Sequence, residues 1–432
     1  MGVLADTIDL EQARMLALAN SRSLARYELS IRSSVLDERS QLYSMLPSLS
    51  ADYSASMSYL DRNWGLVNPI DTFNVGATFS LTQIIFQGGK GFIQKAISAI
   101  STESVRKDAL AEYFNVLDSV DNAYYAVLEA AASLEASESS LQTASLGLSM
   151  AQIRQASGMI NQGDYLRALA DKESRESARN QARRSLALSV TRLNALTGLS
   201  QAVDLAEVNF DAYEDMIQRL AGISDEQADA LYDRFWGILV QANPSLARAA
   251  LNTRRAEKNL SMAKRDYAPT ISATVFSNAL NYSTANGFSN TATGGISIRG
   301  SIPIDFWVMA NRLEKSKIAR DSALLDYAGA ELSLETDLQS SLLNAIAQAE
   351  SVLSSRRTLE YTEKHFEYVM ERYRLSQSSV SDLGEASSLL ITARNSLTRA
   401  RYGFLQSLSR LRSLGAIDDE GELARLLLGD DA

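Results

Sequence analysis

The chain has 432 residues, of which 46% are hydrophobic and 22% charged, and its formal net charge is −10. So acidic a chain lacks the basic surface that phosphate backbones require, and we expect no nucleic-acid partner. With no cysteine and a single histidine, His365, it lacks the usual groups of metal sites and nucleophilic or general-base catalysis. We therefore expect no enzyme, no cofactor and no metal site. No segment approaches the roughly 18 apolar residues of a membrane-spanning helix.

An internal duplication organises the chain. The segment Leu46–Ala51 (LPSLSA) matches Ala268–Ala273 (APTISA) at an offset of 222 residues, and Gly158–Asp164 matches Ser376–Asp382 at an offset of 218. Repeats at fixed spacing indicate repeated structure. We predict a first repeat over 1–200, an acidic equatorial linker over 201–231, a second repeat over 232–416 and a short C-terminal tail over 417–432.

The first repeat begins with a predicted helix over 8–46 and two predicted strands over 48–60 and 73–86. From Leu49 to Tyr59 every odd position is apolar and every even position polar, and Phe73–Thr82 alternates in the same way; this period indicates strands. A long helix over 90–156 and a return helix over 163–197 follow. Apolar residues recur every seventh position from Val120 to Leu148, which indicates coiled-coil packing.

The second repeat carries the same pattern. We predict a helix over 235–267, strands over 270–282 and 294–304, a long helix over 308–375 and a return helix over 382–414. The seven-residue seam reappears from Leu338 to Phe366. Alternation in the strand over 270–282 slips at Phe276, so this strand is the least regular of the four.

The strands suit an outer membrane better than a soluble sheet. Each is about ten residues long, the length of a tilted strand in a membrane barrel, with one face for lipid and one for a polar lumen. The polar faces are rich in Ser, Thr and Asn, with only Asp52 and Arg299 charged. Arg299 is thus a candidate lumen residue, or it pairs with Asp52 or another acid. Four strands cannot close alone, and a membrane tolerates no open sheet edge. Two chains would supply eight strands and a filled barrel, whereas three would supply twelve and a water-filled passage.

The order of these elements resembles the family of TolC-like outer membrane efflux proteins. The resemblance covers about residues 5–417, and it is carried by short segments in both repeats: Ile8-Asp-Leu-Glu-Gln-Ala13, Leu46-Pro-Ser-Leu, Phe86-Gln-Gly-Gly, Ile238–Leu246 and Ser301-Ile-Pro-Ile-Asp305. It implies a mixed α and β membrane protein, in which long helices form an α-barrel and four strands per chain contribute to a trimeric twelve-stranded β-barrel. It also implies a homotrimer that contacts outer membrane lipid, a periplasmic adaptor and an inner-membrane transporter. One departure is Phe306-Trp-Val308, where the first repeat has glycines.

The helices reverse at two places where the apolar seam ends. The resemblance implies that this tip docks the adaptor, through Gly158, Gly163, Ser376 and Ser378, and that Asp164 and Tyr373 help latch a closed entrance; a latching arginine would fall at Ser378 and is absent. Asp382 and Glu385 lie three residues apart, hence on one helix face. In a threefold assembly they would form carboxylate rings and a cation-selective gate. Helix capping by Asp382 explains the local sequence equally well.

These observations favour an outer membrane channel-tunnel of a tripartite export or efflux system, a passive duct for small molecules or proteins. The alternative is a non-conducting structural coiled-coil trimer of the cell envelope; a soluble scaffold leaves the alternating strands unexplained. We expect most of the chain in the periplasm. Met1 and Gly2 stand directly before a mature-like start, so we also expect a signal peptide in the natural precursor.

Overall fold

The computed structural model describes residues 7–58, 72–200, 204–283, 287–288, 293–375 and 377–428. The chain divides into two compact units. The sheet unit contains the described residues within 27–108 and 248–330, and the helical unit contains those within 1–26, 109–247 and 331–432. Among the described residues, no helix has the length and apolar character needed to cross a membrane.

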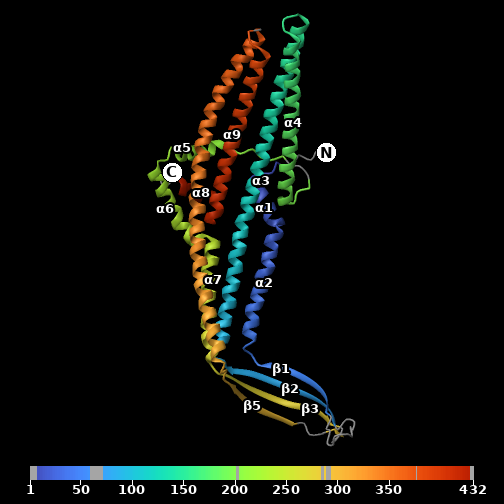
Figure 1. Cartoon of the computed structure of the whole chain (residues 1–432), viewed down its shortest axis with the longest axis vertical. Helices are drawn as coiled ribbons and strands as arrows, with labels where there is room; N and C mark the ends of the chain where they lie inside the picture. The colour runs from blue at the N-terminus through green and yellow to red at the C-terminus, as the bar shows by residue number, and fades with distance from the viewer. Residues whose placement is uncertain are drawn as a thin grey trace. The chain divides into compact units, whose positions relative to one another are not determined.

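The sheet unit is built on an antiparallel sheet in the order β1, β2, β3, β5 (Figure 1). Its strands are β1 (Ser48–Ser58), β2 (Thr72–Phe86), β3 (Thr270–Ser283), β5 (Thr293–Ser301) and a two-residue strand, β4 (Gly287–Phe288), which pairs with the end of β3. The two repeats meet where β2 pairs with β3. The strand predicted over 294–304 ends earlier, at Ser301, two residues before Pro303, which has no backbone N–H for a ladder hydrogen bond. Residues 59 and 60 of the first predicted strand lie outside the described residues.

The helices of the sheet unit follow the same order as the strands (Figure 1). They are α2 (Arg22–Tyr43) before β1, α3 (Lys90–Ala156) after β2, α7 (Pro244–Lys264) with the short helix η2 (Arg265–Tyr267) before β3, and α8 (Phe306–Arg374) after β5. Side chains join each helix to the next: Thr102 of α3 to Ser34 of α2 at 3.2 Å, Arg248 of α7 to Asp108 of α3 at 3.2 Å, and Thr253 of α7 to Ala323 of α8 at 3.0 Å. The sheet unit therefore has two lateral edges, one formed by α2 and β1 and the other by α8 and β5.

A tight turn links β2 to α3. Gly88 adopts φ +68°, and a Cβ on it would lie 2.5 Å from the Ala268 Cβ. Only glycine combines this backbone angle with so close an approach. Beside the turn, Asp266 accepts from Lys90 at 2.7 Å and from Arg312 at 3.0 Å, which ties together the starts of α3 and α8. These hydrogen bonds lower the pKa of Asp266 although its burial opposes them.

The helical unit contains two antiparallel helix pairs. α4 (Gln162–Thr197) returns along α3, and α9 (Val380–Gly415) returns along α8. Ion pairs connect α3 with α4, α8 with α9, and α3 with α9: Arg179–Glu138 at 3.5 Å, Arg394–Glu363 at 3.3 Å and Arg399–Glu129 at 3.7 Å. The predicted seven-residue seam lies between the helices, buried at Val120, Leu338 and Val352 and half-buried at Leu148 and Phe366.

Two predicted helices are each divided in the structure. In place of a helix over 8–46 there are α1 (Leu10–Asn20) and α2. The helix is interrupted because Ser21 is extended and the Asn20 side-chain amide donates to Leu16 O at 2.9 Å and to Thr197 O at 2.7 Å. In place of a helix over 235–267 there are α6 (Asp225–Ala242) and α7 with η2. That break falls at Asn243, since the residue before a proline disfavours helical geometry. The Asn243 amide donates to Leu414 O at 2.9 Å, as Asn20 does to the end of α4.

The linker and tail also contain helices. Residues predicted as a linker over 201–231 include η1 (Phe210–Tyr213), α5 (Glu214–Ala221) and the start of α6, and the tail contains α10 (Glu420–Leu428). α5 is fixed by two hydrogen bonds of 2.7 Å from Arg356 to the Glu214 carboxylate, which lower the pKa of Glu214 to about 2. Arg219 and Arg234 each donate at 3.1 Å to the last carbonyls of α10, where cations stabilise a helix.

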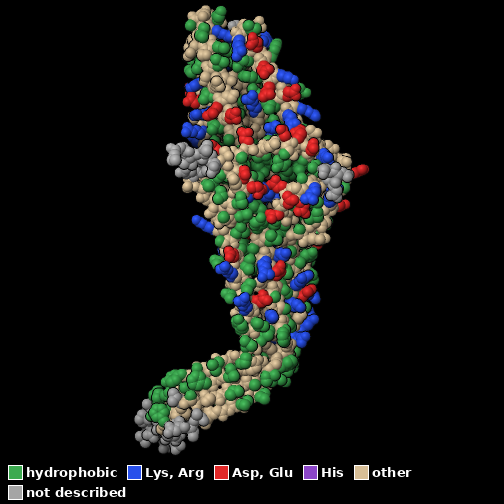
Figure 2. All heavy atoms as spheres, turned by 180° about the vertical axis from the view of Figure 1, so that it is seen from behind, with side chains coloured by type: hydrophobic (Ala, Val, Ile, Leu, Met, Phe, Trp, Pro, Cys, Tyr) green, Lys and Arg blue, Asp and Glu red, His purple; other side chains and the backbone are tan. Residues whose placement is uncertain are grey.

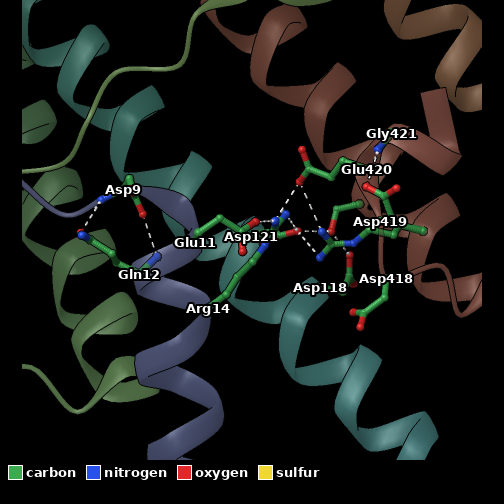
Figure 3. A network of polar contacts seen from close by, with 12 residues as sticks. Asp9, Glu11, Gln12, Arg14, Asp118, Asp121, Asp418, Asp419, Glu420 and Gly421 are labelled. Atoms are coloured by element: carbon green, nitrogen blue, oxygen red, sulfur yellow. Dashed lines mark hydrogen bonds and ion pairs between the residues drawn. The ribbon is translucent and has the colours of Figure 1, made fainter.

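A buried ionic network joins α10 to α1, α3 and α9 (Figure 3). At its centre is Asp121, which is 0% exposed. Its carboxylate accepts from Arg14 at 2.7 and 2.8 Å, from Arg412 at 2.9 Å and from Ser409 at 2.8 Å. Glu420, at the start of α10, pairs with Arg14 at 2.8 Å and with Arg412 at 3.3 Å. Arg14 also pairs with Glu11, so the charges of the two arginines are fully balanced by carboxylates.

Candidate functional site

One face of the sheet is a continuous polar surface. Residues that pair across the strands share a face, and hydroxyl or amide side chains meet there in successive rows. Hydrogen bonds link Ser50 with Ser80 at 2.7 Å, Thr82 with Thr274 at 3.1 Å, Thr78 with Asn278 at 2.8 Å and Asn278 with Thr293 at 3.1 Å. Such cross-strand pairs stabilise the sheet while leaving a wall of neutral hydrogen-bonding groups.

Phe276, where the alternation slips, lies on this polar face, opposite Ser80 of β2 and Gly295 of β5. A Cβ on Gly295 would be 3.0 Å from the Phe276 Cζ, so the ring lies over the glycine instead of standing free. A β-bulge at Ala279 then restores the register. The irregularity is therefore absorbed locally, and the strand runs on to Ser283.

Arg299 also lies on the polar face, opposite Ser272, and is exposed. Asp52, its suggested partner, is on β1, with β2 and β3 between the two strands. The Asp52 carboxylate instead accepts from Ser50 at 3.1 Å. The charge of Arg299 is thus available to whatever this face contacts.

The opposite face of the sheet is apolar and uncovered. Leu49 of β1 is in one row with Leu81, Val275 and Ile296. Leu49 is 75% exposed and Ile296 is 76% exposed. In the view of Figure 2, hydrophobic side chains and uncharged groups make up the surface of the sheet, with no acidic or basic side chain among them. Apolar patches of this extent are rare on soluble monomers and indicate a membrane or protein contact.

The first helix reversal is shaped by a glycine cap. Gly158 adopts φ +69°, and the Met159 N–H donates to Arg154 O at 2.8 Å, which closes α3. The Asn161 side chain then caps α4 by accepting from the Asp164 N–H at 2.9 Å. Asp164 is half-buried and Gly163 is exposed beside it in the first turn.

The second reversal is shaped by a capping box. The Ser379 hydroxyl accepts from the Asp382 N–H at 3.1 Å, and the Asp382 carboxylate accepts from the Ser379 N–H at 2.8 Å. These hydrogen bonds lower the pKa of Asp382. Asp382 and Glu385 are both exposed on α9. Ser378 donates to Val369 O at 3.3 Å; Ser376 lies outside the described residues.

Near these reversals, Tyr373 joins α8 to α3. It is 0% exposed, and its hydroxyl donates to Gly147 O at 3.1 Å. The Arg154 guanidinium lies 4.3 Å from the centre of the Tyr373 ring and donates to the backbone carbonyl of Tyr373. Val369, Leu383 and Ala386 complete the cluster. In the part of the chain that the structure describes, Asp164, the other latch candidate, makes no hydrogen bond or ion pair with Tyr373.

Arg154 was not predicted from the sequence. It is 219 residues from Tyr373, and nothing in its local sequence distinguishes it from other arginines near a helix end. In the described ranges, no group of three or more His, Asp or Glu side chains is placed to hold a metal ion.

Comparison with known proteins assigns the class. The model of the family described as "Outer membrane efflux protein" matches residues 14–199 and 238–416, one match for each repeat. Outer membrane protein TolC of Escherichia coli (strain K12) is 23% identical in an alignment of 416 residues. The match covers 87% of this chain and 75% of TolC.

Solved structures show the same fold. The Campylobacter jejuni CmeC outer membrane channel matches with a TM-score of 0.77 and 16% identity over 94% of this chain and 85% of CmeC. The outer membrane protein VceC of Vibrio cholerae matches with a TM-score of 0.75 and 16% identity over 94% of this chain and 96% of VceC.

Duplicated helix pairs joined to a two-faced sheet therefore define an outer membrane channel protein. The chain belongs to the outer membrane efflux protein family. It is an efflux channel and not an enzyme, located in the outer membrane with most of its residues in the periplasm.

Proposed function

We propose that three copies of this chain close into one passive duct. The observation that carries the proposal is the pair of open edges in the sheet unit. β1 and β5 are both edge strands, and three antiparallel pairings between them make β5 antiparallel to β1. The β5 edge of one copy can therefore continue the antiparallel sheet with the β1 edge of the next. Such a head-to-tail contact generates a ring when the rotation closes.

The helical edges support the same closure. Along α2, apolar side chains at a spacing of seven residues are exposed: Leu29, Leu36 and Tyr43. Along α8, Ile318 and Leu325 are exposed at the same spacing. A seven-residue apolar stripe packs against another helix in coiled coils. These two stripes border opposite edges of the sheet unit, where neighbouring copies would meet.

The number of copies follows from the size of the passage. Two chains would give eight strands, a barrel that side chains fill, whereas three give twelve and leave room for water. In that arrangement the apolar face meets lipid, and the hydroxyl-rich face with Arg299 lines the passage. The chain supplies no energy; an inner-membrane transporter supplies it through a periplasmic adaptor docked at the helix reversals, near Gly158, Gly163, Ser376 and Ser378.

Disulfide cross-linking tests the ring, because the chain has no cysteine of its own. One cysteine replaces Ala55 on β1, and a second is moved along exposed positions of β5 from Ile296 to Gly300. Within one chain these strands are three spacings apart, about 14 Å, too far for a disulfide. We expect oxidised species of up to three chains at one β5 position. A ladder beyond three chains, or monomer at every position, contradicts the proposal.

The gate is proposed separately, at Asp382 and Glu385. Three copies of α9 would bring together six carboxylates, two from the exposed face of each helix, and this negative charge would favour cations. The double variant Asp382→Asn with Glu385→Gln should lower cation preference in planar bilayers, while the asparagine side-chain oxygen can still accept from the Ser379 N–H in the capping box. Unchanged selectivity would mean that Asp382 acts only as a cap.

A further inference from the structure

A cavity of about 270 Å³ lies beneath α10 in the helical unit. Residues of α1, α3, η1, α5, α9 and α10 line it. Ala212 and Gly421, which also line it, are exposed, so the cavity is reachable from solvent. It is separate from the sheet and from the helix reversals, and the duct function does not use it.

The deeper wall of the cavity is apolar. Tyr125, Met216, Leu405, Leu408 and Leu423 line it, and each is buried. The Tyr125 ring is held in place by a stacked contact with Tyr402, with ring centres 6.2 Å apart. An apolar cavity of about 150 Å³ in another protein holds benzene. A cavity nearly twice that volume fits a bicyclic aromatic molecule.

The charged groups at the cavity leave no place for an ionic ligand. The two oxygens of Asp121 accept four hydrogen bonds, from Arg14, Arg412 and Ser409. Arg14 and Arg412 are in turn balanced by Asp121 and by Glu420, and Arg14 also pairs with Glu11. An additional buried charge would be unpaired, which is costly at such a site.

Neutral hydrogen-bonding groups remain. Tyr125 and Tyr213 both line the cavity. Burial raises the pKa of each tyrosine, so both stay protonated at neutral pH. A phenolic hydroxyl both donates and accepts, and can therefore orient a ligand hydroxyl.

We propose that this cavity binds one small, neutral, bicyclic aromatic molecule that carries a single hydroxyl group. The bound molecule would pack between α10 and α5 on one side and α3 and α9 on the other. It would thereby hold the C-terminal helix on the helical unit. The inference goes beyond the duct function and does not depend on it.

The test is calorimetric titration of the purified full-length chain in detergent with 2-naphthol, after subtraction of a titration into detergent alone. We expect saturable binding of one molecule per chain. The matched anion 2-naphthoate should bind at least tenfold more weakly, because no unpaired cation is available to it. Heat that does not saturate beyond the detergent blank, or equal affinity for naphthoate, overturns the proposal.

Two variants locate the site. Ala424→Leu fills the cavity from α10 and should weaken 2-naphthol binding at least tenfold, whereas Ala228→Leu, at a half-buried position of α6 away from the cavity, should leave it unchanged. Leu408→Phe fills the same cavity from α9 and replaces Ala424→Leu if that variant does not fold. Wild-type affinity in a folded filling variant overturns the assignment. Channel conductance, measured in parallel, separates this result from any failure of the proposed duct.

Discussion

Removal of the Asp121 carboxylate should be the most damaging single change in the helical unit. In Asp121→Ala, Arg14 and Arg412 lose their common partner, and they are 5% and 4% exposed. The carboxylates that remain are exposed: Glu420, near both arginines, has a side chain 49% exposed, and Glu11, near Arg14, one 69% exposed. Breaking a buried ion pair on one side costs roughly 3–5 kcal/mol because the remaining charge stays buried. We expect a loss of about 4 kcal/mol in the free energy of unfolding.

The matched control is a more exposed ion pair of the same helix, α3. Asp108 pairs with Arg248 at 3.2 Å, but the two side chains are 28% and 51% exposed. Asp108→Ala should cost no more than about 1 kcal/mol, since water screens such a pair. Both variants remove one aspartate from α3, so the difference isolates burial.

Urea unfolding followed by far-ultraviolet circular dichroism measures both variants, because the signal comes from the long helices. The reasoning predicts a clearly lower midpoint for Asp121→Ala with an unchanged slope. Equal midpoints for the two variants would refute it, because burial of the network would then contribute nothing.

Three further predictions concern separate parts of the fold. Gly88→Ala should destabilise the chain by about 3 kcal/mol, because it adds both backbone strain and a steric clash. Gly89→Ala should cost only about 1 kcal/mol, because Gly89 has φ +78° but no atom lies within 4 Å of the new Cβ. Equal melting temperatures of the two variants would contradict this. Arg154→Gln should loosen the cluster around Tyr373 and increase hydrogen exchange at the end of α8; unchanged exchange would show that the arginine is dispensable. Because the pKa of Glu214 falls from 4.5 to about 2 on folding, its stabilising effect is present above pH 4.5 and is lost as the pH falls toward 2. Glu214→Gln should therefore lower the melting temperature at pH 7 but not near pH 2, and a difference that persists at low pH would contradict the assignment.

The sequence predicts the parts of the fold that depend on local periodicity. Strict alternation from Phe73 to Thr82 is enough to identify β2 and its two faces, because a strand reverses its side chains at every residue. The repeated LPSLSA and APTISA segments give the duplication, and the seam from Val120 to Leu148 gives the packed side of α3.

The rest depends on contacts between distant residues. Arg14 and Asp121 are 107 residues apart, and neither position is unusual in its own helix. The division at Asn20 depends on a hydrogen bond to Thr197, 177 residues away. The sequence predicts only a short tail over 417–432, and the nine residues of α10 are too few for a stable isolated helix. Docking through Glu420 and the arginines of α5 and α6 stabilises this helix in the folded chain.

The most direct test of the central claim is single-channel recording from the purified protein in a planar lipid bilayer. A passive trimeric duct predicts discrete conductance steps of uniform size, with no transporter or energy source added. A bilayer that stays electrically silent after verified insertion of the protein would contradict it, and would leave a structural role for the trimer.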